Sequence, residues 1–130
     1  MNQALDFIIR SLKKGNGGEV FIPKLKAYSL EILKDTILEV LKKDVKTEII
    51  SVRPGEKYHE SLISSEEIRN TFEDDEDYVI LQEKLLQTTN QKLKKTSLKK
   101  EYSSDNVELL DKEQIKNILI KEIPKLVKNK

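Results

Sequence analysis

The stretch Val52-Arg53-Pro54-Gly55-Glu56-Lys57-Tyr58-His59-Glu60 separates two groups of predicted elements with a rigid turn. Proline fixes its own φ and glycine accepts a positive φ, so Arg53-Pro54-Gly55 predicts a tight turn after a strand. Arg53 and Glu56 are expected to project to the same side of it. A guanidinium binds phosphate oxygens as a fork, and a carboxylate accepts bonds from the hydroxyls of a ribose. The pair suits a nucleoside diphosphate, but local chemistry alone favours an ordinary turn with an Arg–Glu ion pair.

Upstream of this turn, helical and strand patterns alternate along the chain. Apolar residues at helical spacing predict one helix over 2–14 and another over 30–43, with Ser29 as the N-cap of the second. Runs of β-branched and aromatic residues predict short strands at 19–23 and 46–52. Glycines 15, 17 and 18 lie between the first helix and the first strand and are expected to form a helix end and a turn.

Downstream of the turn, two capping-box patterns predict helix starts. Ser64 with Glu67 opens a short helix that extends to about Thr71, and Asp111 with Gln114 opens a longer one that ends near Ile123, before Pro124. Short strands are predicted at 60–63 and 78–81.

These elements together predict an α+β fold, a small lobe of short strands and helices. Residues 1–83 form its main region. A lysine-rich linker is expected over 84–100, where six lysines occur without an acidic residue, and residues 101–130 form a final segment with the last helix. Short strands of this kind are typical of an accessory lobe.

Composition excludes several classes of function. The chain has 130 residues, with 24 Lys and Arg against 23 Asp and Glu, so a strongly basic nucleic-acid binder is not expected. It has no cysteine and one histidine, His59, so it holds neither a thiol nucleophile nor an HExxH zinc site. We expect no metal and no membrane span, and a cytoplasmic location.

Motifs for cofactor chemistry are also missing. Gly15-Asn16-Gly17 begins a dinucleotide fingerprint, but Val20 occupies its last position and the order of helix and strand is reversed. None of the four tyrosines is followed four residues later by lysine, so the Tyr-x-x-x-Lys dyad is absent. His59 is expected to be a packing or surface residue, and the acidic run 73–77 to be solvated.

Three longer segments carry a resemblance to a known family. They are Arg53–Thr71, RPGEKYHESLISSEEIRNT; Gly17–Lys24, GGEVFIPK; and Glu101–Asn106, EYSSDN. In their order along the chain they closely resemble the C-terminal, substrate-binding part of the nucleotide-sugar 4,6-dehydratases and epimerases of capsule and surface-polysaccharide synthesis. These enzymes are extended short-chain dehydrogenases.

The resemblance implies that cofactor binding and catalysis belong to one domain of these enzymes and substrate binding to another. Members of that family have an NAD(P)-binding Rossmann domain with a Ser/Thr-Tyr-Lys site, and this chain contains neither, so no cofactor and no catalytic residue are expected here. The resemblance implies that Arg53 contacts the phosphates of UDP and Glu56 its ribose. The chain is therefore expected to be a UDP-sugar-binding part that is not catalytic on its own, with weak affinity. Its partners would be a Rossmann-domain chain or a second copy. The alternative is a stand-alone interaction or self-assembly module descended from that lobe.

Overall fold

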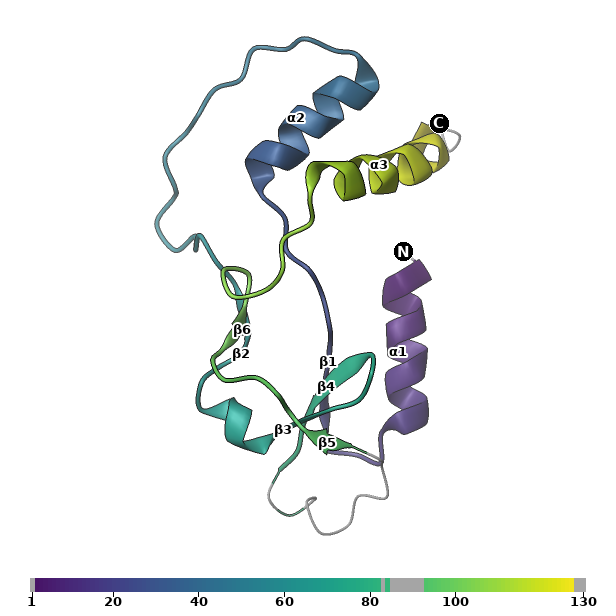
Figure 1. The fold of residues 1–130 in the computed structure, drawn as a ribbon, viewed down its shortest axis with the longest axis vertical. Coiled ribbons are helices and arrows are strands. Elements are labelled where there is room, and N and C mark those ends of the chain that lie inside the picture. The colour runs from purple at the N-terminus through teal and green to yellow at the C-terminus, as the bar shows by residue number, and fades with distance from the viewer. Residues whose placement is uncertain (1, 83, 85–92, 128–130) are drawn as a thin grey trace. The chain divides into compact units, whose positions relative to one another are not determined.

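The computed structural model describes residues 2–82, 84 and 93–127 and has an α+β fold, as predicted. Its strands are short and antiparallel, and its three described α-helices lie near the two ends and in the first half of the chain (Figure 1). The elements are α1 (Asn2–Lys14), β1 (Val20–Pro23), α2 (Leu30–Leu41), β2 (Ser61–Ile63), the 3₁₀ helix η1 (Glu67–Asn70), β3 (Thr71–Glu73), β4 (Asp77–Ile80), β5 (Lys94–Lys95), β6 (Tyr102–Ser103) and α3 (Lys112–Val127).

The chain divides into two compact units that are interleaved in sequence. The first unit contains residues 1–25 and 61–106, and the second contains residues 26–60 and 107–130. The expected division into 1–83, 84–100 and 101–130 stays a prediction, because residues 85–92 of its linker lie outside the described residues. Within the described part of that segment, Lys94 and Lys95 form β5.

A four-stranded sheet with the order β1-β4-β3-β5 forms the core of the first unit. Val79 on β4 faces Phe21 of β1 and Phe72 of β3 in register, and it is completely buried. The burial of this strand agrees with its continuous apolar sequence from Tyr78 to Leu81, which is the pattern that predicts a strand there. Leu81, just beyond β4, is also buried.

A second, two-stranded sheet in the same unit pairs β2 with β6. Its buried residues are Ile63, Tyr102 and Ser103. The Tyr102 ring lies 4.9 Å from that of Tyr78, and its hydroxyl donates to the Leu25 carbonyl at 2.7 Å while accepting from the Leu25 N–H. A buried tyrosine hydroxyl needs such partners, and here they fix the chain after β1.

The second unit is built from α2 and α3, which pack against each other. Ser29 caps α2 as predicted, and the predicted box at α3 forms, with Gln114 N–H donating to Asp111 Oδ1 at 2.8 Å and Asp111 N–H donating to Gln114 Oε1 at 3.1 Å. Between the helices, Glu39 of α2 pairs with Lys112 and Lys116 of α3 at 2.8 and 2.5 Å. These two ammonium groups lower the pKa of Glu39 to about 2.

Three predictions of local structure are wrong. The short helix predicted from Ser64 to about Thr71 is only the 3₁₀ helix Glu67–Asn70, and Thr71 already belongs to β3. The 46–52 segment is not a strand, because a strand needs a neighbour for its backbone groups and none of the described strands pairs with it. The last helix does not stop before Pro124 but continues to Val127. Proline removes one backbone donor, and in a final turn this interruption is small enough for the helix to continue.

Candidate functional site

The predicted turn at Arg53 forms in the second unit. The Glu56 N–H donates to the Arg53 carbonyl at 3.0 Å, and Gly55 has a φ of +91°. Proline followed by a glycine of positive φ is the pattern of a type II turn. A side chain at Gly55 would be strained by this φ, so the backbone favours glycine at this position.

The charged groups of the turn are arranged differently from the expected ion pair. Within the described part of the chain, the Glu56 carboxylate accepts at 2.9 Å from the backbone N–H of Arg53, not from its guanidinium. The carboxylate therefore adds a side-chain hydrogen bond that closes the turn. Arg53 and Glu56 are both exposed at the surface of the unit. The structure brings the two predicted residues together and leaves them accessible to a ligand.

His59 and the residues around it stay on the exposed side of the same loop. Residues 53–60 are all exposed, which agrees with a surface position for His59. The neighbouring strand β2 begins at Ser61 in the first unit.

The glycine loop after α1 does not fit a dinucleotide. Its backbone donors are already bound by an anion of the chain itself, because Glu19 accepts from Asn16 N–H at 3.0 and 3.2 Å and from Gly17 N–H at 2.7 Å. The bond from Asn16 is the main reason why the pKa of Glu19 is lowered. The loop lies between a helix and a strand in the wrong order for pyrophosphate binding, so NAD(P) has no fitting cradle there.

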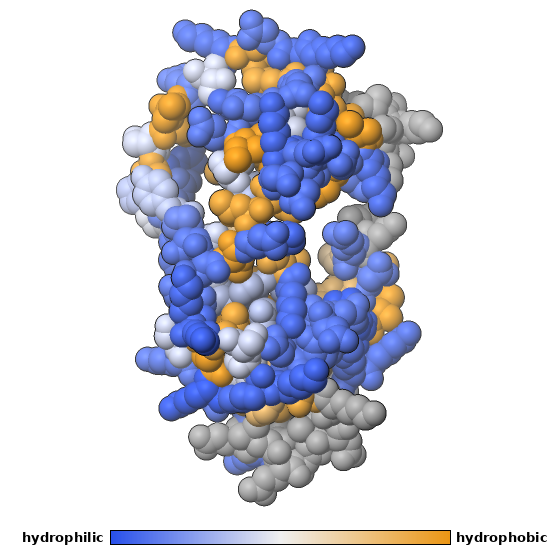
Figure 2. All heavy atoms as spheres, viewed as in Figure 1, coloured by the Kyte–Doolittle hydropathy of each residue, from blue (hydrophilic) through white to orange (hydrophobic). Residues whose placement is uncertain are grey.

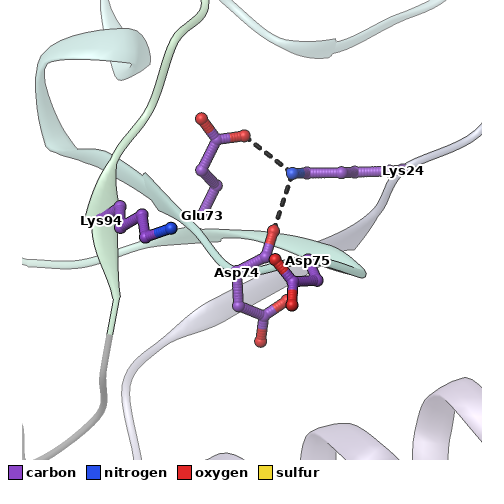
Figure 3. Close-up of a pocket in the computed structure, with 5 residues that line it drawn as sticks. All are labelled: Lys24, Glu73, Asp74, Asp75 and Lys94. Carbon is purple, nitrogen blue, oxygen red and sulfur yellow. Dashed lines mark hydrogen bonds and ion pairs between the residues drawn. The ribbon is translucent and has the colours of Figure 1, made fainter.

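A polar cavity of about 340 Å³ lies in the first unit beside the β3–β4 turn. Figure 3 shows its lining, which consists of Lys24, Glu73, Asp74, Asp75 and Lys94. Lys24 Nζ lies 2.8 Å from Glu73 Oε2 and donates to the Asp74 carbonyl at 2.7 Å. The ammonium group also lies 5.0 Å from the centre of the Tyr78 ring, a cation–π distance.

The carboxylate of Glu73 in this cavity stays ionised. Burial works to raise its pKa, but hydrogen bonds from Lys24 and from the Ser97 N–H outweigh burial and lower the pKa below its usual value. Its charge is thus already compensated by groups of the chain. Within the described residues no group of carboxylates and histidines has the arrangement of a metal site.

A buried ion cluster in the first unit was missed by the sequence analysis, which treated 73–77 as a solvated run. Asp77 is completely buried and accepts from Arg10 at 2.8 and 2.7 Å, as a bidentate pair, and from Lys14 at 3.2 Å. Lys14 also bonds Asp74 at 2.6 Å. The cations come from α1, more than 60 positions earlier in the chain, so no local sequence pattern predicts the cluster.

The pKa of Asp77 responds to two opposing effects. Burial is the largest and raises it, but hydrogen bonds from Arg10 and Lys14 prevail and hold the pKa below its ordinary value. The cluster attaches α1 to the β3–β4 turn, and its two cations, Arg10 and Lys14, pair with the carboxylates of Asp74, Glu76 and Asp77. It is a structural feature, and the exposed turn at Arg53 remains the best candidate for binding.

Comparison with known proteins agrees with this fold. A family profile described as "Polysaccharide biosynthesis protein" matches residues 1–83. The chain is 32% identical over 126 residues to an uncharacterized membrane protein of Methanocaldococcus jannaschii, and 29% identical over 122 residues to the UDP-glucose 4-epimerase of Rickettsia rickettsii. These matches cover 92% and 90% of the chain.

A solved structure is similar over nearly the same range. The X-ray structure of Pen from Bacillus thuringiensis superimposes with a TM-score of 0.78 at 32% identity, covering 93% of this chain. The chain spans about 36% of the length of that protein and of both relatives. Among the described helices, none has the length and apolar character that crossing a membrane demands.

Proposed function

Because the chain belongs to the polysaccharide biosynthesis protein family, we propose that it is the UDP-sugar-binding part of a nucleotide-sugar dehydratase or epimerase. In this proposal Arg53 binds the diphosphate and Glu56 the ribose, and the chain has no catalytic residue of its own. One observation supports the proposal: the Pro-Gly turn places Arg53 and Glu56 on one exposed loop, three positions apart.

The chemistry of the turn suits this ligand. Arginine supplies a positive charge and two parallel donors, which match the oxygens of a pyrophosphate. Glu56 uses one oxygen to close the turn, so its other oxygen is available to accept from a ribose hydroxyl. The turn is on an open surface, and a ligand would be covered on one side only. We therefore expect a dissociation constant in the millimolar range, which corresponds to about −4 kcal/mol.

Titration of the ¹⁵N-labelled chain with UDP tests the proposal. We expect chemical-shift changes centred on residues 52–57. Arg53→Ala should abolish them, because losing a hydrogen bond to a charged group costs about 1.5–3 kcal/mol, most of the expected total. Lys57→Ala is the matched control, since it removes the same charge from the same exposed loop and should leave the shifts in place.

The proposed role of Glu56 in binding the ribose can be separated from its role in closing the turn. Glu56→Gln keeps an amide oxygen that can still accept from the Arg53 N–H, so the turn should remain. It should weaken UDP binding more than the binding of 2′,3′-dideoxy-UDP, which lacks the ribose diol. Identical responses of the wild type, Arg53→Ala and Lys57→Ala to UDP would refute the proposed site.

A second candidate function is an interaction module that binds another polypeptide. It is favoured by the apolar side of α1, where Leu5, Ile8, Ile9 and Leu12 are each at least 43% exposed. Figure 2 shows such apolar side chains reaching the surface among hydrophilic ones on the visible face. If UDP leaves all chemical shifts unchanged, this second candidate becomes the better description of the chain.

A further inference from the structure

Residues 44–50, Asp-Val-Lys-Thr-Glu-Ile-Ile, form a strand-like segment without a partner. Residues 43–53 contain no helix, turn, bend or strand, and every residue from 44 to 50 is exposed. Ile49 is 95% and Ile50 68% exposed. Figure 1 shows the segment as part of the long trace that leaves α2. Such an apolar, β-branched segment with free backbone groups is suited to pairing with another strand.

We propose that this segment pairs antiparallel with the same segment of a second copy, about a two-fold axis at Thr47. This inference goes beyond the proposed function and does not rest on it. In a two-fold interface the same residues must serve on both sides, so the segment has to be complementary to itself. The sequence of 44–50 meets this condition in one register.

Charge and hydropathy select that register. With Thr47 opposite its own copy, Lys46 faces Glu48 of the second chain, and symmetry produces this opposite-charge pair twice. Val45 then faces Ile49, which covers the most exposed isoleucine with another apolar side chain. The full set of cross-strand partners is Asp44 with Ile50, Val45 with Ile49, Lys46 with Glu48, and Thr47 with Thr47.

The structure at the end of α2 argues against a competing register. Centring the pair on Val45 would place Lys42 opposite Glu48 and Asp44 opposite Lys46. However, the backbone of Lys42 has a positive φ of 51° and its N–H bonds the Glu39 carbonyl, while the Lys43 N–H bonds the Leu38 carbonyl. Neither residue is available to a ladder, and that register would leave Ile49 and Ile50 uncovered. A strand that starts at Asp44 and ends at Ile50 favours Thr47 as its centre.

Charge reversal and sedimentation test the pairing. The wild type should show a concentration-dependent dimer by analytical ultracentrifugation. Lys46→Glu and Glu48→Lys should each weaken it about tenfold or more, because each creates two like-charge pairs from two attractive ones. The double variant Lys46→Glu with Glu48→Lys restores opposite charges and should recover the wild-type dimer. Both positions of change carry exposed side chains, so circular dichroism should show an unchanged fold.

Single cysteines provide a second, independent measurement, since the chain has none of its own. Thr47→Cys places two thiols opposite each other at the axis, and mild oxidation should link two copies. Val45→Cys is the control, because its two copies would lie about 14 Å apart along the strands, too far for a disulfide. A chain that stays monomeric at high concentration, a dimer that ignores both charge reversals, or preferential linking at position 45 would each overturn the proposal.

Discussion

Asp77 is the residue on which the attachment of α1 to the sheet depends most. Its buried carboxylate receives three hydrogen bonds from Arg10 and Lys14, while its own N–H is bound by Asp74. Removing the charge would leave two cations facing a neutral group. Asp77→Asn should therefore lower the opening free energy of the first unit by about 2–3 kcal/mol. Amide hydrogen exchange of Val79, which lies two residues further along β4 and is completely buried, measures this loss.

Asp75 provides the matched control for that substitution. It lies in the same turn but is exposed, so Asp75→Asn should change the opening free energy by less than about 0.5 kcal/mol. Equal effects of the two substitutions would show that the ion cluster does not hold α1.

The same carboxylate predicts a pH dependence. Its folded pKa is below the ordinary value, so the folded state binds fewer protons than the unfolded state near pH 4. The stability that Asp77 contributes is then fully present above about pH 5 and is lost as the pH falls through its folded pKa. Glu73 and Asp74, whose pKa values are also lowered, act in the same direction.

This acid sensitivity should be reduced in Asp77→Asn. Val79 exchange, corrected for intrinsic rates, should show a larger loss of protection between pH 6 and pH 3.5 in the wild type than in the variant. Parallel losses in the two proteins would place the acid-sensitive groups elsewhere.

At the scale of elements, the start of α3 depends on the Asp111–Gln114 box. The Asp111 carboxylate satisfies a backbone donor that would otherwise have no partner in the first turn. Asp111→Ala should cost about 1 kcal/mol of helix stability, whereas Asp111→Asn, an equally good N-cap, should cost only a few tenths. Thermal unfolding followed at 222 nm distinguishes the two. A loss in Asp111→Asn as large as that in Asp111→Ala would argue against the cap.

These examples show which parts of the structure were predictable. Caps and turns at Ser29, Ser64, Asp111 and Pro54 depend on residues within a few positions of each other. Those at Ser29, Asp111 and Pro54 form as predicted, whereas Ser64 and Glu67 exchange their hydrogen bonds ahead of a 3₁₀ helix whose N-cap is Glu66. The burial of Asp77 depends on α1, which lies more than 60 positions earlier in the chain, so its surroundings could not be inferred from neighbouring residues. The 46–52 segment has the side chains of a strand, but strand formation also requires a partner that local composition cannot supply.

At the scale of the whole molecule, the last prediction concerns the activity of the chain alone. Its relatives include UDP-glucose 4-epimerases, and it spans about 36% of their length. We expect the purified chain to convert no UDP-glucose to UDP-galactose when NAD is added. The reason is chemical: the sequence has neither a dinucleotide fingerprint nor a Tyr-x-x-x-Lys dyad, and Glu19 occupies the donors of its one glycine loop.

The assay needs a positive control and a proof that the inert chain is folded. The Rickettsia rickettsii UDP-glucose 4-epimerase, run under the same conditions, serves as the first. The UDP titration of the same sample serves as the second, because shifts at residues 52–57 require an intact turn. Product above the level of the buffer blank would contradict the expectation and would mean that hydride transfer is supported by residues outside every motif considered. Absence of product together with Arg53-dependent shifts would separate binding from catalysis, since the same chain would hold the nucleotide and leave the sugar unchanged.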